Sequence, residues 1–302
     1  MYVIYHSADL DGIFSGAIVK YFKPNVTLVP WNYGEPLPEL EPNRPVVICD
    51  VSFPVEDLDR ISLNSYLQTV WIDHHKSAID DFADNVENYK FLKHVKTHLS
   101  LEKSGCELTW EYFFPDKPVP FLVQCIADYD IWKGSEEDQW ESLILPVQYG
   151  SRFFYKTPED VDFFYESLPI KEQAVAVMND IGTIGTYLWE WEKDRFKQLA
   201  KKSFRGEVKE TKESCVFVNS PTGSSQIFDY LEDKEVDFCV VFRREKDGYK
   251  FSVYSPFRKL DCSKFAMRYG GGGHVGSSGF SSKDFDSIFS IDGGTNTEEE
   301  TN

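Results

Sequence analysis

Residues 2–22 read YVIYHSADLDGIFSGAIVKYF, and this stretch decides the fold. Its first five residues, Tyr2–His6, are mostly apolar or aromatic and predict a buried strand. Residues 12–22 carry apolar side chains at helical spacing, at Ile13, Ala17, Ile18 and Phe22, and predict a helix. Strand followed by helix is the pattern of proteins with a parallel sheet.

The alternation continues through the first third of the chain. Further strands are predicted at 26–31, 45–51 and 67–72, with a helix at 54–63 and two more helices at 101–114 and 119–132. We therefore expect an α/β fold whose N-terminal sheet is mostly parallel, with helices on both faces.

A helical spacer and a smaller second domain are predicted to follow. Residues 158–204 have a helical pattern throughout, and the polar segment 205–213 breaks it. A new α/β unit then begins, with strands at 215–219, 237–243 and 249–254 and a helix near 225–231. The expected parts are residues 1–165 as the first domain, 166–205 as the spacer, 206–292 as the smaller C-terminal α/β domain and 293–302 as a disordered acidic tail.

Composition excludes several classes of protein. The 302 residues include 32 Lys and Arg against 50 Asp and Glu, a net charge of −18, so long duplex nucleic acid is a disfavoured partner. Because no apolar run is long enough to span a bilayer, we expect a soluble, cytoplasmic protein without a membrane partner. The six cysteines are widely spaced and sit in apolar runs, so we expect free, buried thiols.

Four apolar segments end in Asp or His, which predicts one shared site. The carboxyl ends of parallel strands lie side by side and bind ligands, so we expect these side chains to meet. Taken singly, DLDG at 9–12 is also typical of a helix N-cap, with Asp11 accepting the hydrogen bonds, and Asp50 is typical of a cap on the next turn. The residues are His6, Asp9, Asp11, Asp50, Asp73, His74, His75, Asp128 and Asp130.

Such a cluster favours bound metal. Several carboxylates that meet cannot all stay ionised without cations between them. Mixed carboxylate and imidazole ligands suit Mn²⁺, carboxylate-rich sets suit Mg²⁺ and Mn²⁺ alike, and the lack of cysteine ligands argues against structural zinc. Two ions about 3.5–4 Å apart would bridge an attacking hydroxide and stabilise in-line displacement at phosphorus. The expected cofactor is two divalent ions, Mn²⁺ with Mg²⁺ or Co²⁺ as alternatives.

These residues resemble the DHH phosphoesterase superfamily. Asp9-Leu-Asp11-Gly12, Asp50, Asp73-His74-His75 and Asp128 are similar to its motifs one to four, in the same order. Gly270-Gly271-Gly272-Gly273-His274, preceded by Arg268 and followed by Ser277-Ser278-Gly279-Phe280, resembles the signature of the DHH-associated substrate-binding domain. The resemblance spans about residues 1–292. The segment Ala-Asp128-Tyr-Asp130-Ile-Trp132 is most similar to the oligoribonuclease (nano-RNase) branch.

The resemblance implies a role for each position. It makes Asp73 and His75 catalytic, with His75 touching the scissile phosphate, and makes Asp50 the bridge between the ions. His6 is either a further ligand or a residue packed below the site, and Asp130 is the alternative ligand to Asp128. The implied metal ligands are Asp9, Asp11, Asp50, His74 and Asp128, and the implied substrate-binding residues are Gly271, Gly272, Gly273, His274, Ser255 and Arg258.

The glycine run also has its own physical interpretation. Successive glycine N–H groups can form a nest that binds phosphate or carboxylate, to which His274 would add a directed donor. A flexible linker is the alternative.

The resulting hypothesis is a metal-dependent phosphodiesterase for short oligonucleotides, either nano-RNA or linear and cyclic dinucleotides. Hydroxide attack between two metals would release nucleoside monophosphates. The alternatives are a phosphatase for adenosine 3′,5′-bisphosphate, pyrophosphate or polyphosphate, and a non-enzymatic nucleotide sensor. The expected partner is the small nucleotide substrate itself, and a homodimer is left open.

Overall fold

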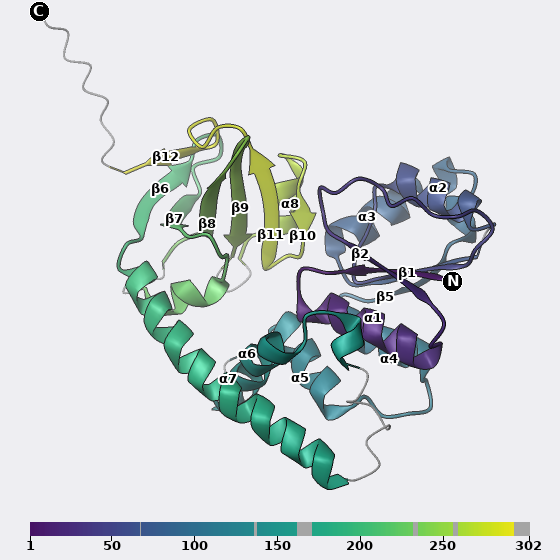
Figure 1. The fold of residues 1–302 in the computed structure, drawn as a ribbon. Helices are drawn as coiled ribbons and strands as arrows, with labels where there is room; N and C mark the ends of the chain where they lie inside the picture. Colours follow the sequence, from purple (N-terminus) through teal and green to yellow (C-terminus); the bar gives the residue numbers. More distant parts are fainter. Residues whose placement is uncertain (67, 136–137, 162–170, 232–234, 256–258, 293–302) are drawn as a thin grey trace, which may run out of the picture. The chain divides into compact units, whose positions relative to one another are not determined.

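The structure is a computed structural model that describes residues 1–302 except 67, 136–137, 162–170, 232–234, 256–258 and 293–302. The predicted acidic tail, 293–302, therefore lies outside the described residues. The chain divides into two compact units, Met1–Trp191 and Glu192–Asn302. This division falls inside α7 (Lys171–Ala200), the long helix of Figure 1. The predicted domain boundaries near residues 165 and 205 lie on either side of this helix.

Among the described residues, the first unit is built on a five-stranded sheet in the order β2-β1-β3-β4-β5. Every strand pair in it is parallel, which confirms the predicted α/β class. The strand β5 was missed because its sequence, KTHL, is largely polar and lies at the edge of the sheet. The strands are β1 (Tyr2–His6), β2 (Thr27–Trp31), β3 (Val46–Cys49), β4 (Thr69–Asp73) and β5 (Lys96–Leu99).

Helices cover both faces of this sheet. Side chains of β1 alternate, so that Val3 packs with α1 and α4, whereas Tyr2 and Ile4 pack with α2 and α3 on the other face. Figure 1 shows the same arrangement, with α1 and α4 on one side of the strands and α2 and α3 on the other. The helices are α1 (Leu10–Phe22), α2 (Val55–Asn64), α3 (Lys76–Asn85) and α4 (Gly105–Phe113).

A helical layer extends the α1 face. Phe14, Ala17 and Ile18 of α1 are fully buried against residues of α4, α5 and α6. This layer places the end of α5 near the beginning of α1 and thereby positions one side of the site. The remaining elements of the unit are α5 (Phe121–Asp130), α6 (Leu145–Phe154), the π-helical turn Trp140–Ile144 and the 3-10 turns Val86–Asn88, Leu92–His94 and Pro158–Val161.

The second unit is a seven-stranded sheet with α8 (Cys262–Met267) packed on it, counted over the described residues. The order is β10-β11-β9-β8-β7-β6-β12, and only the β7–β8 pair is parallel. Phe217, Phe251 and Phe289 are fully buried in its core. The strands are β6 (Phe204–Val208), β7 (Ser214–Asn219), β8 (Phe238–Glu245), β9 (Gly248–Tyr254), β10 (Gly272–Gly273), β11 (Ser277–Ser282) and β12 (Phe289–Ile291).

Two local predictions for this unit need detail from the structure. The helical pattern does end before the polar segment 205–213, but the sheet of the second unit begins there and not at residue 215, because most of β6 lies in this segment and pairs with β7 and β12. The helix expected near 225–231 is present as a 3-10 helix, Ser225–Tyr230.

The cysteine prediction is confirmed, because all six cysteines lie in the described part of the chain and each is free and buried. A helix long and apolar enough to cross a bilayer does not occur among the described residues.

Candidate metal centre

The predicted site residues follow three neighbouring strands. β1 ends at His6, β3 ends immediately before Asp50, and β4 ends at Asp73. These strands are adjacent in the sheet, in the order β1-β3-β4, so their carboxyl ends lie side by side. The last residue of α5, Asp130, joins them from the helical layer through its contact with His74.

The two aspartates at the start of α1 have different partners. Asp9 is the N-cap of α1, and its Oδ1 accepts the Gly12 N–H at 3.0 Å. Asp11 is buried, and its two oxygens accept the N–H groups of Gly105 at 2.7 Å and Cys106 at 2.9 Å. The alternative in which Asp11 caps α1 is therefore wrong, because Asp11 binds the amino end of α4, where the helix dipole favours a carboxylate.

Asp50 occupies the centre of the cluster. Its backbone has φ +56°, a left-handed conformation in which aspartate is more frequent than most residues, and its side chain is buried. Oδ1 lies 3.2 Å from His74 Nε2, while Oδ2 lies 3.8 Å from His6 Nδ1. The two oxygens of Asp50 thus face two different imidazoles.

Within the first unit, three groups of side chains have ligand atoms that all lie within 4.8 Å of one another: His6, Asp9 and Asp50; Asp11, His74 and Asp130; Asp50, Asp73 and His75. In the first group, His6 Nδ1 lies 2.9 Å from Asp9 Oδ2. In the second, His74 Nε2 lies 3.6 Å from Asp11 Oδ2 and 3.4 Å from Asp130 Oδ2. Asp50 adjoins the second group through His74, so one carboxylate connects both.

The DHH triplet is tied together by Asp73. This side chain is fully buried, and its Oδ1 accepts the His74 N–H at 2.8 Å and lies 2.7 Å from His75 Nδ1. This contact orients the His75 ring, so that its other nitrogen, Nε2, lies on the side of the ring away from Asp73.

The electrostatics favour a cation. Burial raises the pKa of Asp50 well above its usual value, and the charges of Asp11 and Asp9 raise it further. Burial and the same two carboxylates also raise the pKa of Asp130. For His74, burial and then the neighbouring His75 lower the pKa. Without a cation, the buried carboxylates therefore repel one another.

The imidazole of His6 pairs with Asp9. Burial opposes the charge on both side chains, but their mutual attraction outweighs it, so the pKa of His6 is raised and that of Asp9 is lowered. The surroundings of this pair therefore favour the charged forms of both side chains, whereas those of Asp50 disfavour its charged form.

One buried oxygen of the proposed ligands passes a direct test of fit for metal. Asp50 Oδ1 is inaccessible to solvent and makes no hydrogen bond, a costly state for a buried acceptor. A divalent cation offers this oxygen the missing partner, and carboxylate with imidazole is a donor set that Mn²⁺ accepts. The residues present therefore fit the predicted metal ions.

Asp128 lies outside all three groups. Its Oδ1 accepts from Gln124 Nε2 at 2.8 Å and lies 3.3 Å from Lys133 Nζ. Because residues two apart on a helix point to nearly opposite sides, only one of Asp128 and Asp130 can face the cluster, and Asp130 does.

No model of a known protein family matches this chain. The uncharacterized protein R106 of Acanthamoeba polyphaga mimivirus is 29% identical over 300 residues, which cover 92% of this chain and 66% of the viral protein. The oligoribonuclease NrnB of Bacillus subtilis (strain 168) is 21% identical over 317 residues, which cover 94% of this chain and 73% of that protein.

The fold is shared with a DHH-domain protein of known structure. It is described as a member of the s1p family of ribosomal proteins, PF0399 DHH domain, and matches with a TM-score of 0.51 and 12% identity over 96% of this chain and 82% of that one. The fold of this chain is therefore that of a DHH-domain protein.

The glycine run lies in the second unit and is part of its sheet. Gly272 and Gly273 form β10, which pairs with β11. The N–H of Gly271 donates to Ala266 O at 3.0 Å, and that of His274 to Ser277 O at 2.8 Å. The expectation of a nest of successive open glycine N–H groups is therefore wrong for Gly271, whose donor already binds a protein carbonyl, and the backbone N–H of His274 is bound to a carbonyl as well.

The glycines have a packing role instead. A Cβ on Gly271 would lie 2.1 Å from Gly279 O, and Gly273 has φ +137°, where side chains are rarely tolerated. These two positions allow β10 to approach β11 closely.

The other predicted substrate-binding residues have different outcomes. Ser255 is buried, and its Oγ accepts the Leu260 N–H at 3.0 Å. Arg258 lies outside the described residues.

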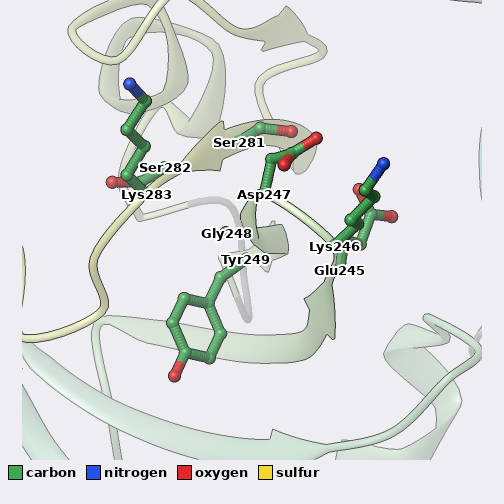
Figure 2. Close-up of a pocket in the computed structure, with 8 residues that line it drawn as sticks. All are labelled: Glu245, Lys246, Asp247, Gly248, Tyr249, Ser281, Ser282 and Lys283. Atoms are coloured by element: carbon green, nitrogen blue, oxygen red, sulfur yellow. The ribbon is translucent and has the colours of Figure 1, made fainter.

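The second unit also has a surface cavity of about 270 Å³ at the β8–β9 turn, between residues of that turn and of the end of β11 (Figure 2). None of the predicted site residues lines it, and both acidic and basic side chains do. It is lined by Glu245, Lys246, Asp247, Gly248, Tyr249, Ser281, Ser282 and Lys283.

One residue at the site was missed from the sequence. Tyr33 follows β2, and its ring lies edge-on to His6 at 5.7 Å and to His75 at 5.9 Å between centroids. It stands in a polar loop, WNYGEP, where no hydrophobic periodicity marks it. Its only signal was position, because the loop follows the strand next to β1 in the sheet.

Proposed function

We propose that this protein is a metal-dependent phosphodiesterase that hydrolyses short oligonucleotides to nucleoside monophosphates. The observation that carries the proposal is the position of Asp50, whose two oxygens face His74 and His6 in two separate ligand groups. A carboxylate placed in this way is suited to bridge a pair of cations.

Six residues are proposed to hold two divalent ions. His6, Asp9 and Asp50 form one set, and Asp50, Asp11, His74 and Asp130 form the other. When bound, such a pair lowers the pKa of the attacking water and stabilises the attacking and leaving oxygens of an in-line displacement at phosphorus. Asp130 replaces Asp128 in this proposal because Asp128 is engaged by Gln124 and Lys133.

The chain's own residues orient the reacting groups. Asp73 accepts from the backbone at His74 and holds His75 Nδ1 at 2.7 Å, so the imidazole of His75 presents Nε2 in a fixed direction. We assign Nε2 of His75 as a donor to a non-bridging oxygen of the scissile phosphate, where it offsets charge as the transition state forms. Asp73 is then a positioning residue rather than a group that touches the substrate.

Two observations support a short oligonucleotide as the substrate. NrnB, named an oligoribonuclease, aligns with 94% of this chain. The net charge of −18 disfavours binding along an extended phosphate backbone, so a compact substrate fits the chain better. Substrate binding by Gly272, Gly273, His274 and Ser255 of the second unit remains part of the proposal.

The test is turnover of an RNA ladder of two to twenty nucleotides with Mn²⁺, with products separated by chromatography. The proposal predicts nucleoside monophosphates and rates that fall as the substrate lengthens. A parallel panel contains adenosine 3′,5′-bisphosphate, pyrophosphate and polyphosphate, from which released inorganic phosphate would support the phosphatase alternative. Metal-dependent nucleotide binding with no product from either panel would support the sensor.

A further inference from the structure

Tyr33 stands in a tight turn beside the metal centre. The Glu35 N–H donates to Asn32 O at 3.1 Å, which closes a four-residue turn with Tyr33 in its second position. Gly34 follows in the third position with φ +94°, the conformation that a type II turn requires. The Glu35 carboxylate accepts the Asn32 N–H at 3.1 Å and so reinforces the turn.

The side chain of Tyr33 is fixed from two directions. Its hydroxyl lies 3.1 Å from Ser52 Oγ and accepts the Ser52 N–H at 3.3 Å. Its ring meets the Trp31 ring edge-on at 5.6 Å. Because Ser52 lies two residues after Asp50, the same loop positions the bridging carboxylate and the tyrosine hydroxyl. Because the Tyr33 side chain is already held in place, binding a ligand against it costs little additional conformational entropy.

Tyr33 nevertheless remains partly open to solvent. Tyr33 is 47% exposed although it touches His6 and His75 of the cluster, whose side chains are each 14% exposed. An immobilised and exposed aromatic ring next to buried charged groups is unusual for a packing residue, which would bury its ring. The arrangement is suited to contact with an apolar, planar part of a substrate.

We propose that Tyr33 packs against the base of a nucleoside next to the scissile phosphate. The substrate class is then nucleoside phosphate esters rather than inorganic polyphosphates, which have no planar apolar group to offer the ring. This inference rests on the proposed function and specifies the part of the substrate that the first unit recognises. A ring surface also tolerates every base, as required of an enzyme for oligonucleotides of mixed sequence.

The first experiment compares substrates that differ only in a base. Wild type, Tyr33→Ala and Tyr33→Phe are assayed with the dinucleotide pApA and with two analogues that each lack one base. Tyr33→Ala is expected to lower kcat/KM for pApA by about 5- to 150-fold, the range for one lost base–aromatic stack, mainly through KM. It is expected to leave the rate unchanged for the analogue that lacks the contacted base. Tyr33→Phe keeps the ring and should retain the preference for pApA.

Tyr66 provides a matched control variant. It is 73% exposed and lies before β4, at the amino-terminal end of the strand whose carboxyl end carries Asp73. Its φ of +58° is tolerated by asparagine, so Tyr66→Asn removes an exposed tyrosine without backbone strain. This variant should match wild type on all three substrates.

A second readout does not depend on turnover. Calorimetry with Mn²⁺-loaded protein compares AMP with ribose 5-phosphate, which lacks the base. Wild type should bind AMP more tightly, and Tyr33→Ala should bind the two ligands equally. The inference would be overturned if Tyr33→Ala lowered kcat/KM equally for pApA and both analogues and still bound AMP more tightly than ribose 5-phosphate. The ring would then serve to hold His6 and His75 in place. Failure of wild type to cleave any oligonucleotide would instead refute the proposed function, while the AMP comparison would still test Tyr33.

Discussion

Replacing Gly105 by alanine should displace Asp50 and disable the metal centre. A Cβ at this position would lie 2.5 Å from Asp50 Cβ and 2.6 Å from its Oδ1. Carbon atoms in contact are about 3.5–4.0 Å apart, so the added Cβ would lie about 1 Å too close to Asp50. Gly105 cannot easily withdraw, because its N–H donates to Asp11 Oδ2 at 2.7 Å at the start of α4. The strain should therefore move Asp50.

The expected magnitudes differ for stability and activity. Overpacking of this kind lowers the free energy of unfolding by about 1–3 kcal/mol. A shift of about 1 Å in a reacting group lowers turnover by about 100-fold, and here it moves the carboxylate that both ligand groups share. We thus expect Gly105→Ala to remain folded while losing most of its activity.

The assay combines urea unfolding with chelator present, Mn²⁺ calorimetry and turnover of pApA. Gly182→Ala is the control, because a Cβ at Gly182 in α7 meets no heavy atom within 4 Å and should raise helix stability by up to about 1 kcal/mol. A Gly105→Ala protein with wild-type Mn²⁺ affinity and turnover would refute the reasoning that places Asp50 at the bridge.

Three further predictions concern the carboxylates. Asp130→Asn should weaken Mn²⁺ binding in calorimetry, whereas Asp128→Asn should bind as wild type does; the reverse result would reinstate Asp128 as the ligand. With a chelator present, Asp50→Asn should raise Tm, because it removes a buried charge that Asp11 and Asp9 repel. The expected rise is about 2–4 °C for each kcal/mol gained in the free energy of unfolding. A lower Tm would contradict the raised pKa of Asp50. That gain should shrink as the pH falls through the raised pKa of Asp50, since the folded wild type then takes up the proton and becomes neutral there; thermal scans from pH 8 to pH 4 test this sign.

The sequence predicted the sheet and most of the cluster because both depend on strand ends. A buried strand has a clear apolar pattern, and a residue that follows it must lie at the sheet edge, as Asp50 and Asp73 do. The same logic failed for β5 and β6, whose polar residues carry too little apolar pattern.

The sequence could not decide whether Asp128 or Asp130 faces the cluster. Two residues apart on a helix, they face nearly opposite directions, and only the packing of α5 decides which direction the site occupies. Tyr33 likewise could not be predicted, because a turn closed by Asn32 and Glu35 brings it to His6 and His75 without any periodic signal.

The most direct test of the account is a crystal structure of the protein grown with Mn²⁺ and measured at the manganese absorption edge. We expect two anomalous peaks in the first unit, one beside His6, Asp9 and Asp50 and the other beside Asp11, His74 and Asp130, with Asp50 touching both. A single peak, or a peak ligated by Asp128 with Asp50 turned away, would contradict the bridging role on which the proposed chemistry depends.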